Sequence, residues 1–342
     1  YIKLTSFSRT SHEEIKKAIA ELKKQGMKNL VLDLQNNGGG LLWSAKNISD
    51  EFLKGDKLIV YSEGRSQPRR DLKAGDANNE GVWEKGRLVI LTNEHTASAS
   101  EIVSGAVQDW DRGLIVGRRT FGKGLVQRPI DLSDGSQIRL TIARYFTPSG
   151  RFIQKSYEDK EEYQNDYVNR YKHGELSYRD SIDLPDSLKG FTLITKREVY
   201  GGGGIMPDFF VPIDTSGISD LFKDINRKGV INRFTLKYTN DEREKLLSEY
   251  KSFKKFKNNF SISKDLFDSF LDDVKSDSVE IKKEDLAESK ELLELRLKAS
   301  IAQNLYEDAT FYEIMNTENA ALVEALKILK EKKYDKVNLA KQ

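Results

Sequence analysis

The sequence contains the same pattern twice: a short apolar run, then glycines or small hydroxyl residues, then residues at helical spacing. The first run covers residues 29–34 and stops at Asn36–Gly40, and the second covers residues 87–92 and leads into Thr96–Glu101. Short apolar runs without a helical period are typical of buried strands. Ligands of α/β folds bind where such strands end. The repeat therefore predicts an α/β fold with a functional site at the carboxyl ends of two strands.

Further segments extend the predicted α/β unit. A capping box at Ser11–Glu14 predicts the start of a helix. The polar, glycine- and asparagine-rich stretch from Ser66 to Gly86 predicts a loop. Residues 205–212, which follow four glycines, predict an edge strand that returns to the core. Other strands are expected at residues 58–61, 114–117 and 136–146.

Two changes in composition divide the chain. From Lys155 to Tyr200 the sequence is charged and rich in tyrosine without a sustained period, which predicts an insertion at about residues 155–200. Beyond residue 213, Lys, Glu, Leu and Phe dominate, and one apolar stripe keeps helical spacing through Leu286, Leu293, Leu297, Ile301 and Leu305. The predicted organisation is a core at residues 1–213 and a mainly helical domain at residues 214–342.

Composition excludes several classes of function. The chain has 56 Lys and Arg against 54 Asp and Glu, and a net charge of +2 argues against a nucleic-acid binder, which needs a strong basic field. Without cysteine, the chain has no disulfide, thiolate metal site or cysteine nucleophile. Its three histidines, His12, His95 and His173, form no convincing ligand cluster. No stretch approaches the about 18 consecutive apolar residues of a membrane helix.

The turn at Thr96–Glu101 has the form expected around a nucleophilic serine. A sharp strand-to-helix turn with small neighbours lets a substrate carbonyl approach and points backbone N–H groups at its developing negative charge. Ser98 is the candidate nucleophile in this turn. The alternative is structural, because Ser98 and Ser100 are also good helix N-caps. The glycines of Asn36–Gly40 offer further free N–H groups, with a purely structural turn as the alternative.

Lys123, which lies between two glycines, is a second candidate for chemistry. In a Ser/Lys variant of Ser-His-Asp catalysis the lysine amine is the general base. Lowering its pKa from ~10.4 to ~7 or 8 requires roughly 4 kcal/mol of differential desolvation, so Lys123 is expected to be buried. A lysine on a solvated face is the alternative. Residues 117–123 also match most of a phosphate-binding loop, but Gly124 replaces the required Ser or Thr and no helix is expected after it, so nucleotide binding is not predicted.

Four segments together resemble the carboxyl-terminal processing, or tail-specific, serine peptidases. The resemblance covers about residues 1–154 and 204–212, and it depends on residues 31–42, 96–102, 120–127 and 145–150. It implies an α/β peptidase core of the ClpP and crotonase type. The implied activity is that of a serine endopeptidase, which cleaves polypeptides near their C-terminal tails through an acyl-enzyme.

The same resemblance assigns roles to individual residues. It implies that Ser98 is the nucleophile, that Lys123 is the base and that Gln127 positions the lysine. The implied oxyanion hole consists of the backbone N–H groups of Ala99 and of Gly40 or Gly39. Lys123 and Gln127 are four residues apart, and their side chains meet in a helical turn but not across the ~13 Å of an extended segment.

The resemblance also has implications outside the site. Members usually carry an upstream PDZ domain, and none is recognisable in this chain, whose residues 1–7 resemble the strand that follows it. The implied partners are polypeptides with accessible apolar C-termini, and no metal, organic cofactor, nucleotide or nucleic acid is implied. The implied location is the periplasm or cell envelope. The helical tail has no counterpart in compact members and is a candidate for envelope association or homo-oligomer formation.

Two rival interpretations stay open at this point. His95, three residues before Ser98, and Asp33 suggest a Ser98-His95-Asp33 triad, although an imidazole in the same turn rarely aligns on the hydroxyl. A non-catalytic peptide-binding or assembly scaffold with a peptidase-like core is the competing class of function.

The sequence departs from the family pattern at Gln35, where the family commonly has arginine.

Overall fold

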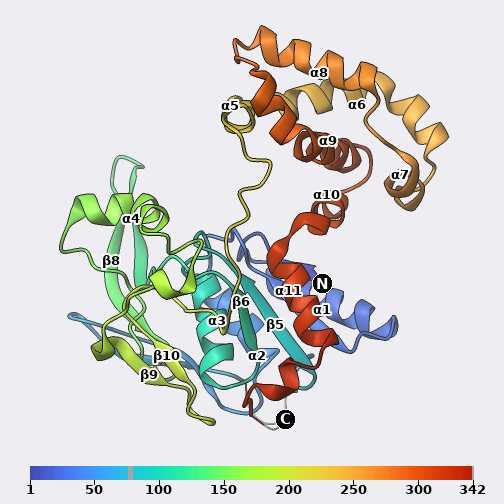
Figure 1. Cartoon of the computed structure of the whole chain (residues 1–342). Coiled ribbons are helices and arrows are strands. Elements are labelled where there is room, and N and C mark those ends of the chain that lie inside the picture. Colours follow the sequence, from blue (N-terminus) through green and yellow to red (C-terminus); the bar gives the residue numbers. More distant parts are fainter. Residues whose placement is uncertain (76–79, 341–342) are drawn as a thin grey trace. The chain divides into compact units, whose positions relative to one another are not determined.

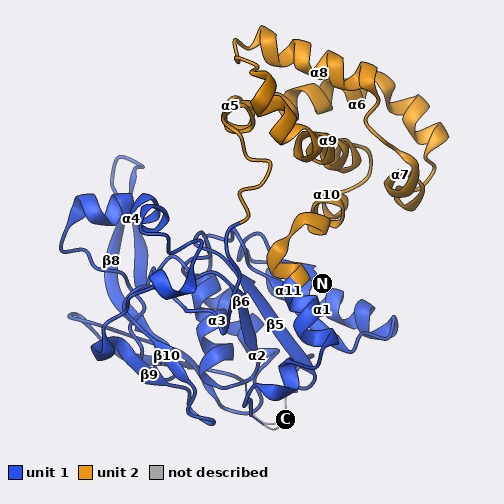
Figure 2. Cartoon of the chain, viewed as in Figure 1, with its two compact units in different colours: residues 1–213, 324–342 blue, residues 214–323 orange. Residues whose placement is uncertain are grey.

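A computed structural model of the chain describes residues 1–75 and 80–340. The chain forms two compact units, which Figure 2 colours separately. Unit 1 comprises residues 1–213 together with residues 324–342, and unit 2 comprises residues 214–323. Unit 2 is therefore inserted into the sequence of unit 1.

A five-stranded parallel sheet forms the centre of unit 1 (Figure 1). Its strands, in spatial order, are β1 (Ile2–Lys3), β2 (Asn29–Asp33), β5 (Arg87–Thr92), β6 (Leu114–Gly117) and β11 (Phe209–Phe210). Asp33 at the end of β2 pairs with Leu91 near the end of β5. The turns that follow these two strands therefore leave the sheet next to each other, and the predicted α/β fold is confirmed. The predicted edge strand at residues 205–212 is also confirmed, as β11.

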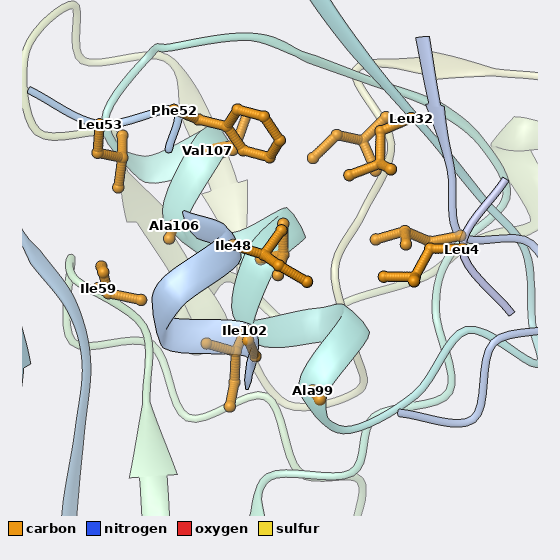
Figure 3. Close-up of a cluster of buried hydrophobic side chains, with 14 of the residues drawn as sticks. Leu4, Leu32, Ile48, Phe52, Leu53, Ile59, Ala99, Ile102, Ala106 and Val107 are labelled. Atoms are coloured by element: carbon orange, nitrogen blue, oxygen red, sulfur yellow. The ribbon is translucent and has the colours of Figure 1, made fainter. Parts of the chain in front are cut away.

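Three helices belong to this part of unit 1: α1 (Ser11–Lys24), α2 (Leu42–Asp50) and α3 (Ala99–Asp109). Helix α3 is buried over its whole length because its sequence is small or apolar nearly throughout. Figure 3 shows Ala99, Ile102, Ala106 and Val107 of α3 in the same apolar cluster as Ile48 of α2 and Leu32 of β2. The start of α3 is therefore held from both the helix layer and the sheet.

The start of α1 differs from the prediction. The Ser11 hydroxyl lies 2.9 Å from the carbonyl oxygen of Ser6 and accepts the backbone N–H of Ser8 at 2.9 Å. No side chain caps the helix. The predicted capping box is therefore wrong, because the hydroxyl fixes the preceding turn instead, whereas the helix is confirmed.

A second, antiparallel sheet has the order β4-β3-β8-β7. Its strands are β3 (Leu58–Gly64), β4 (Gln67–Lys73), β7 (Leu125–Asp131) and β8 (Gln137–Phe146). The loop prediction for Ser66–Gly86 is wrong over β4, which is mostly exposed and forms by pairing with β3, so it has no apolar pattern to reveal it. Residues 76–79 of that predicted loop lie outside the described residues. Strand β7 is an edge strand, which matters for the site below.

The predicted insertion contains regular structure that its sequence did not indicate. It forms helix α4 (Lys160–Lys172), two short 3₁₀ helices η1 (Arg179–Ser181) and η2 (Asp186–Leu188), and the antiparallel pair β9 (Lys189–Phe191) and β10 (Glu198–Tyr200). Arg170 is the one buried residue of α4. The helix therefore has no apolar stripe by which a sequence pattern could predict it.

Unit 2 is helical, with no strand among its residues. Its helices are α5 (Asp220–Lys228), α6 (Val230–Glu249), α7 (Phe253–Asn259), α8 (Lys264–Ser276), α9 (Lys283–Leu305), α10 (Asp308–Met315) and the 3₁₀ helix η3 (Asn316–Glu318). The predicted stripe lies on α9, where Leu293, Leu297 and Ile301 are completely buried. Within the described residues, the structure contains no helix that is both long and apolar enough to span a membrane.

The carboxyl-terminal residues differ from the predicted domain of residues 214–342. The boundary between the units falls within α11 (Ala320–Lys330), and residues 324–342, including η4 (Tyr334–Lys336), belong to unit 1. The reason is a set of contacts with β5. The Tyr334 hydroxyl accepts the backbone N–H of Leu88 at 3.1 Å, and Arg87 donates to Asp335 at 3.0 Å.

Candidate active site

The two turns that follow β2 and β5 border one open cavity of about 550 Å³. The first residues of edge strand β7 form another part of its lining. The cavity is lined by Gly38, Gly39, Gly40, Leu41, Leu42, Ser98, Ala99, Ile102, Lys123, Leu125, Val126, Gln127, Pro129, Arg139 and Tyr145. All six residues that the sequence singled out for catalysis are therefore brought to the same cavity.

Ser98 is in a strained backbone conformation between β5 and α3. Its φ is 57° and its ψ is −115°, which L-residues other than glycine rarely adopt. Such strain is typical of the sharp strand-to-helix turns that carry a nucleophile, because this conformation exposes the side-chain oxygen. Ser98 is half-buried at the N-cap position of α3. Ser100 is not an N-cap, since it lies inside the helix and its hydroxyl donates to the carbonyl oxygen of Asn37 at 2.9 Å.

The glycine turn packs directly against the Ser98 turn. Gly39 has a φ of +97°, and a Cβ atom there would lie 2.7 Å from the carbonyl oxygen of Ala97 and 2.8 Å from the Ser98 Cβ. Only glycine fits this contact. The carbonyl oxygen of Asn37 accepts the backbone N–H of Ala97 at 3.0 Å, which joins the two turns by a hydrogen bond.

Two of the three predicted oxyanion donors have free backbone N–H groups. The N–H of Gly39 donates to the Asn37 side chain at 2.9 Å. Among the described residues, the N–H groups of Gly40 and Ala99 donate to no protein acceptor. Gly40 and Ala99 therefore have donors available for a bound oxygen atom, and Gly39 does not.

A buried carboxylate links the Ser98 turn to the Lys123 loop. Glu101 Oε2 accepts the backbone N–H groups of Ser98 at 2.8 Å and Lys123 at 2.9 Å. Its Oε1 accepts the Thr120 hydroxyl at 2.6 Å and the Gly122 N–H at 2.7 Å. Burial raises the pKa of the Glu101 carboxyl, while these four hydrogen bonds act in the opposite direction.

Tyr145 makes a second link between the same two segments. Its hydroxyl donates to the carbonyl oxygen of Lys123 and lies 3.1 Å from that of Ser98. Burial, together with the nearby Glu101, raises the pKa of the Tyr145 hydroxyl well above its ordinary value. The phenol therefore stays protonated and acts as a hydrogen-bond donor.

Lys123 is half-buried, not buried as predicted, and Gln127 is exposed. Within the described residues, the Lys123 ammonium forms no hydrogen bond or ion pair, and none joins it to the Ser98 hydroxyl or the Gln127 amide. Lys123 precedes β7, and the β7–β8 register shifts between Val126 and Gln127. This irregularity turns Gln127 relative to a regular strand, and both side chains line the cavity.

The Ser98-His95-Asp33 triad is not assembled. Asp33 accepts the Tyr1 hydroxyl at 2.7 Å and the Lys3 ammonium at 3.1 Å. The His95 imidazole is 52% exposed, lies 3.8 Å from Glu94 and packs on the ring of Tyr167. The triad interpretation is therefore wrong, because the carboxylate and imidazole have other partners.

The phosphate-loop pattern of residues 117–123 leads into strand β7, so the prediction that no helix follows it is confirmed. The N–H groups of Gly122 and Lys123, which a phosphate would need, donate to Glu101. Across residues 1–75 and 80–340, no group of three or more His, Asp or Glu side chains is placed to hold a metal ion.

Residues 1–162 match peptidase family S41. The chain is 44% identical over 155 residues to the chloroplastic C-terminal processing peptidase of Tetradesmus obliquus, which covers 45% of this chain and 32% of that protein. It is 42% identical over 155 residues to the carboxyl-terminal-processing protease of Synechocystis sp., which covers 45% of this chain and 35% of that protein. Residues 1–162 are therefore similar to the carboxyl-terminal processing peptidases of family S41, and the predicted resemblance is confirmed.

Two further similarities were found, one for unit 2 and one to a protein of known structure. Residues 221–307, within unit 2, match a family of unknown function, DUF8443. A photosystem II D1 C-terminal processing protease of known structure is 42% identical, with a TM-score of 0.39, and the match covers 43% of this chain and 37% of that one. The chain spans about a third of the length of the curated relatives named here.

The sequence assigned no role to Glu101 or Tyr145, although both lie in the segments that carry the family resemblance, residues 96–102 and 145–150. Glu101 lies three residues after Ser98, which is the spacing of a capping box, and its N–H acceptor role at Ser98 could have been inferred from that spacing. Its bonds to Gly122 and Lys123 connect segments that are distant in sequence. No local pattern predicts them.

Proposed function

We propose that unit 1 is a serine endopeptidase with Ser98 as nucleophile and Lys123 as general base. The observation that supports this most is the double link through Glu101 and Tyr145, which holds the Ser98 turn and the Lys123 loop on one cavity. A structural serine and a solvent-facing lysine need no such connection. The identity with carboxyl-terminal processing peptidases over residues 1–162 supports the same reaction.

In the proposed mechanism the neutral Lys123 amine removes the proton from the Ser98 hydroxyl, whose oxygen attacks the substrate carbonyl carbon. The C–N bond of the tetrahedral intermediate then breaks as the protonated lysine gives its proton to the leaving amine. In the second half the neutral lysine takes a proton from water, whose oxygen attacks the acyl carbon, and returns that proton to the Ser98 oxygen as the ester bond breaks. A peptide that covers the cavity would exclude water from the half-buried lysine side chain. Gln127, on the same cavity, is proposed to orient the amine.

The tetrahedral oxyanion is proposed to bind the backbone N–H groups of Ala99 and Gly40. Among the described residues neither N–H group donates to a protein acceptor, and both residues line the cavity, whereas the Gly39 N–H already donates to Asn37. Gly40 is therefore favoured over Gly39 as the second donor. One such donor is typically worth about 3 to 4 kcal/mol of transition-state stabilisation.

The substrate is proposed to be an extended polypeptide near its C-terminal tail. Strand β7 is an edge strand along the cavity, so its outer backbone groups are available for pairing with a peptide strand. Leu42, Ile102 and Leu125 give the cavity an apolar wall, which suits apolar substrate side chains. By likeness to the family, the proposed location is the periplasm or cell envelope.

The test is proteolysis of denatured casein and labelling by a fluorophosphonate probe. We expect wild-type protein to cleave casein and to be labelled at Ser98, and both Ser98→Ala and Lys123→Ala to lose cleavage. Ser187→Ala and Lys160→Ala, at exposed positions, are the matched controls. Full activity in either site variant overturns the mechanism. Casein binding without cleavage or labelling supports a non-catalytic scaffold instead.

A further inference from the structure

Helix α4 of the insertion touches both segments that carry the proposed catalytic pair. Tyr163 is followed at three, four and seven positions by Asp166, Tyr167 and Arg170, which is the spacing of one face of a helix. This face contacts the Ser98 and Lys123 segments: Arg170 is buried and Tyr163 and Asp166 are half-buried, while Tyr167 is 42% exposed. Helix α4 therefore connects the tyrosine-rich insertion to the segments that carry the proposed pair; Figure 1 shows this helix.

Arg170 binds the chain just before Lys123. Its guanidinium donates to the carbonyl oxygens of Arg119 at 2.8 Å and Thr120 at 3.2 Å, and to Glu175 at 2.7 Å. Only 5% of Arg170 is exposed. Glu175 also accepts both Nε and Nη2 of Arg119, so the arginine pair and its carboxylate form a closed network. The planar guanidinium meets these three acceptors with donors in a fixed fork geometry, which the ammonium of lysine does not have.

Two more contacts of α4 reach the same segments. Lys155, at the start of the insertion, donates to the carbonyl oxygen of Tyr163 at 3.2 Å and its ammonium lies 4.0 Å from the centre of the Phe121 ring. On the other side, the Tyr167 ring lies 5.2 Å from the His95 imidazole, three residues before Ser98. The Phe121 N–H donates to the carbonyl oxygen of Thr96 at 2.9 Å, so these contacts act on two loops that already touch.

We propose that α4 is a clamp that holds the Ser98 turn and the Lys123 loop in register, with Arg170 as its positioning residue. This inference rests on the proposed function. Arg170 binds the carbonyl oxygens of Arg119 and Thr120. Glu101 and Tyr145 bind the backbone N–H and carbonyl groups of Lys123 in the same loop. Removing the clamp leaves substrate contacts in the cavity intact and misplaces the lysine relative to the serine. The expected loss is therefore in kcat and not in KM.

The experiment compares Arg170→Met with Arg179→Met, an exposed arginine of the same insertion. For Arg170→Met we expect at least a tenfold fall in kcat on a peptide substrate, with KM within twofold. We also expect at least tenfold faster amide hydrogen exchange in a peptide covering residues 119–124, with unchanged exchange in residues 87–92. Arg170→Lys, which keeps the charge but not all the hydrogen bonds, should fall between these values, and Arg179→Met should match wild type.

Unchanged exchange at residues 119–124 overturns the clamp, and so does faster exchange without a loss of kcat. If wild-type protein neither cleaves nor is labelled, the proposed function fails, and the exchange result alone then decides whether α4 holds the loop. Tyr167→Ala serves if tryptophan fluorescence shows Arg170→Met to be unfolded. It should raise exchange in residues 94–98 and lower kcat in the same way, and no change in either quantity overturns the proposal.

Discussion

The carboxylate of Glu101 accepts the backbone N–H of Lys123 at 2.9 Å. The same oxygen atom accepts the N–H of Ser98 at 2.8 Å. One buried atom therefore joins the turn of the proposed nucleophile to the loop of the proposed base, over a distance of more than twenty positions in the sequence. The pair is held through the backbone, which leaves both side chains free to face the cavity.

Replacing Glu101 by glutamine should separate the two segments. An amide has one acceptor oxygen, and its NH₂ group would face two of the four donors that now point at the carboxylate. We expect kcat to fall at least ~100-fold, the size of effect seen when reacting groups shift by about 1 Å. Steady-state kinetics against Glu14→Gln, an exposed position on α1, measures the effect. Wild-type kcat in Glu101→Gln would contradict the linking role.

Gly39→Ala should disturb the Ser98 turn by steric contact. The new methyl group would lie 2.8 Å from the Ser98 Cβ and from the Ala99 nitrogen. We expect a loss of about 1 to 3 kcal/mol in the free energy of unfolding and a large loss of activity. Gly135→Ala is the matched control, since Gly135 also has a positive φ of +82° but nothing lies within 4 Å of its Cβ position. Equal losses of activity in Gly39→Ala and Gly135→Ala would contradict the steric explanation, because the two positions share only a positive φ.

Glu175 should make the stability of unit 1 depend on pH. Burial opposes ionisation of Glu175, but Arg119 and Arg170 outweigh this effect and lower its pKa. A carboxyl with a lowered pKa in the folded state adds stability above its unfolded pKa of ~4.3 and loses it as the pH falls through the folded value. The difference in free energy of unfolding between wild type and Glu175→Gln should therefore be largest near neutral pH and shrink below about pH 4.

This dependence can be measured by urea unfolding at several pH values. The three tryptophans, Trp43, Trp83 and Trp110, all lie in unit 1, so their fluorescence reports on that unit. Asp166→Asn is a useful comparison, because Asp166 of α4 pairs with Lys155, whereas Glu175 pairs with Arg119 and Arg170. A stability difference for Glu175→Gln that grows toward low pH would contradict the assignment.

Tyr334→Ala should destabilise unit 1 although it lies close to the carboxyl end of the chain. The ring is 5% exposed, and its hydroxyl accepts the Leu88 N–H of β5. Deleting a buried aromatic side chain typically costs about 3 to 5 kcal/mol. We expect the tryptophan-detected unfolding midpoint to fall accordingly. Lys336→Ala, in the same short helix, should leave it unchanged, and an unshifted midpoint in Tyr334→Ala would show that residues 324–342 do not support β5.

Much of the proposed site follows from local rules of sequence. Small residues after an apolar run predicted the Ser98 turn, and the glycines of Asn36–Gly40 predicted a turn with free N–H groups, because both depend on conformations of adjacent residues. Lys123 was identified by its glycine neighbours, but its expected burial was wrong. Burial is a property of the whole surrounding surface, and β7 leaves one side of this cavity open.

The amino-acid sequence determined the two strand-turn-helix segments of the core, the two loops that carry the proposed chemistry and the resemblance of residues 1–162 to family S41. These depend on residue type and spacing within short segments. Only the tertiary structure decided that Glu101 and Tyr145 join those loops, that Gly40 and not Gly39 has a free N–H group, and that Arg170 of the insertion holds the Lys123 loop. Each of these is a hydrogen-bonding choice between segments that are distant in sequence, and it is made only when folding excludes water and brings one donor to one acceptor.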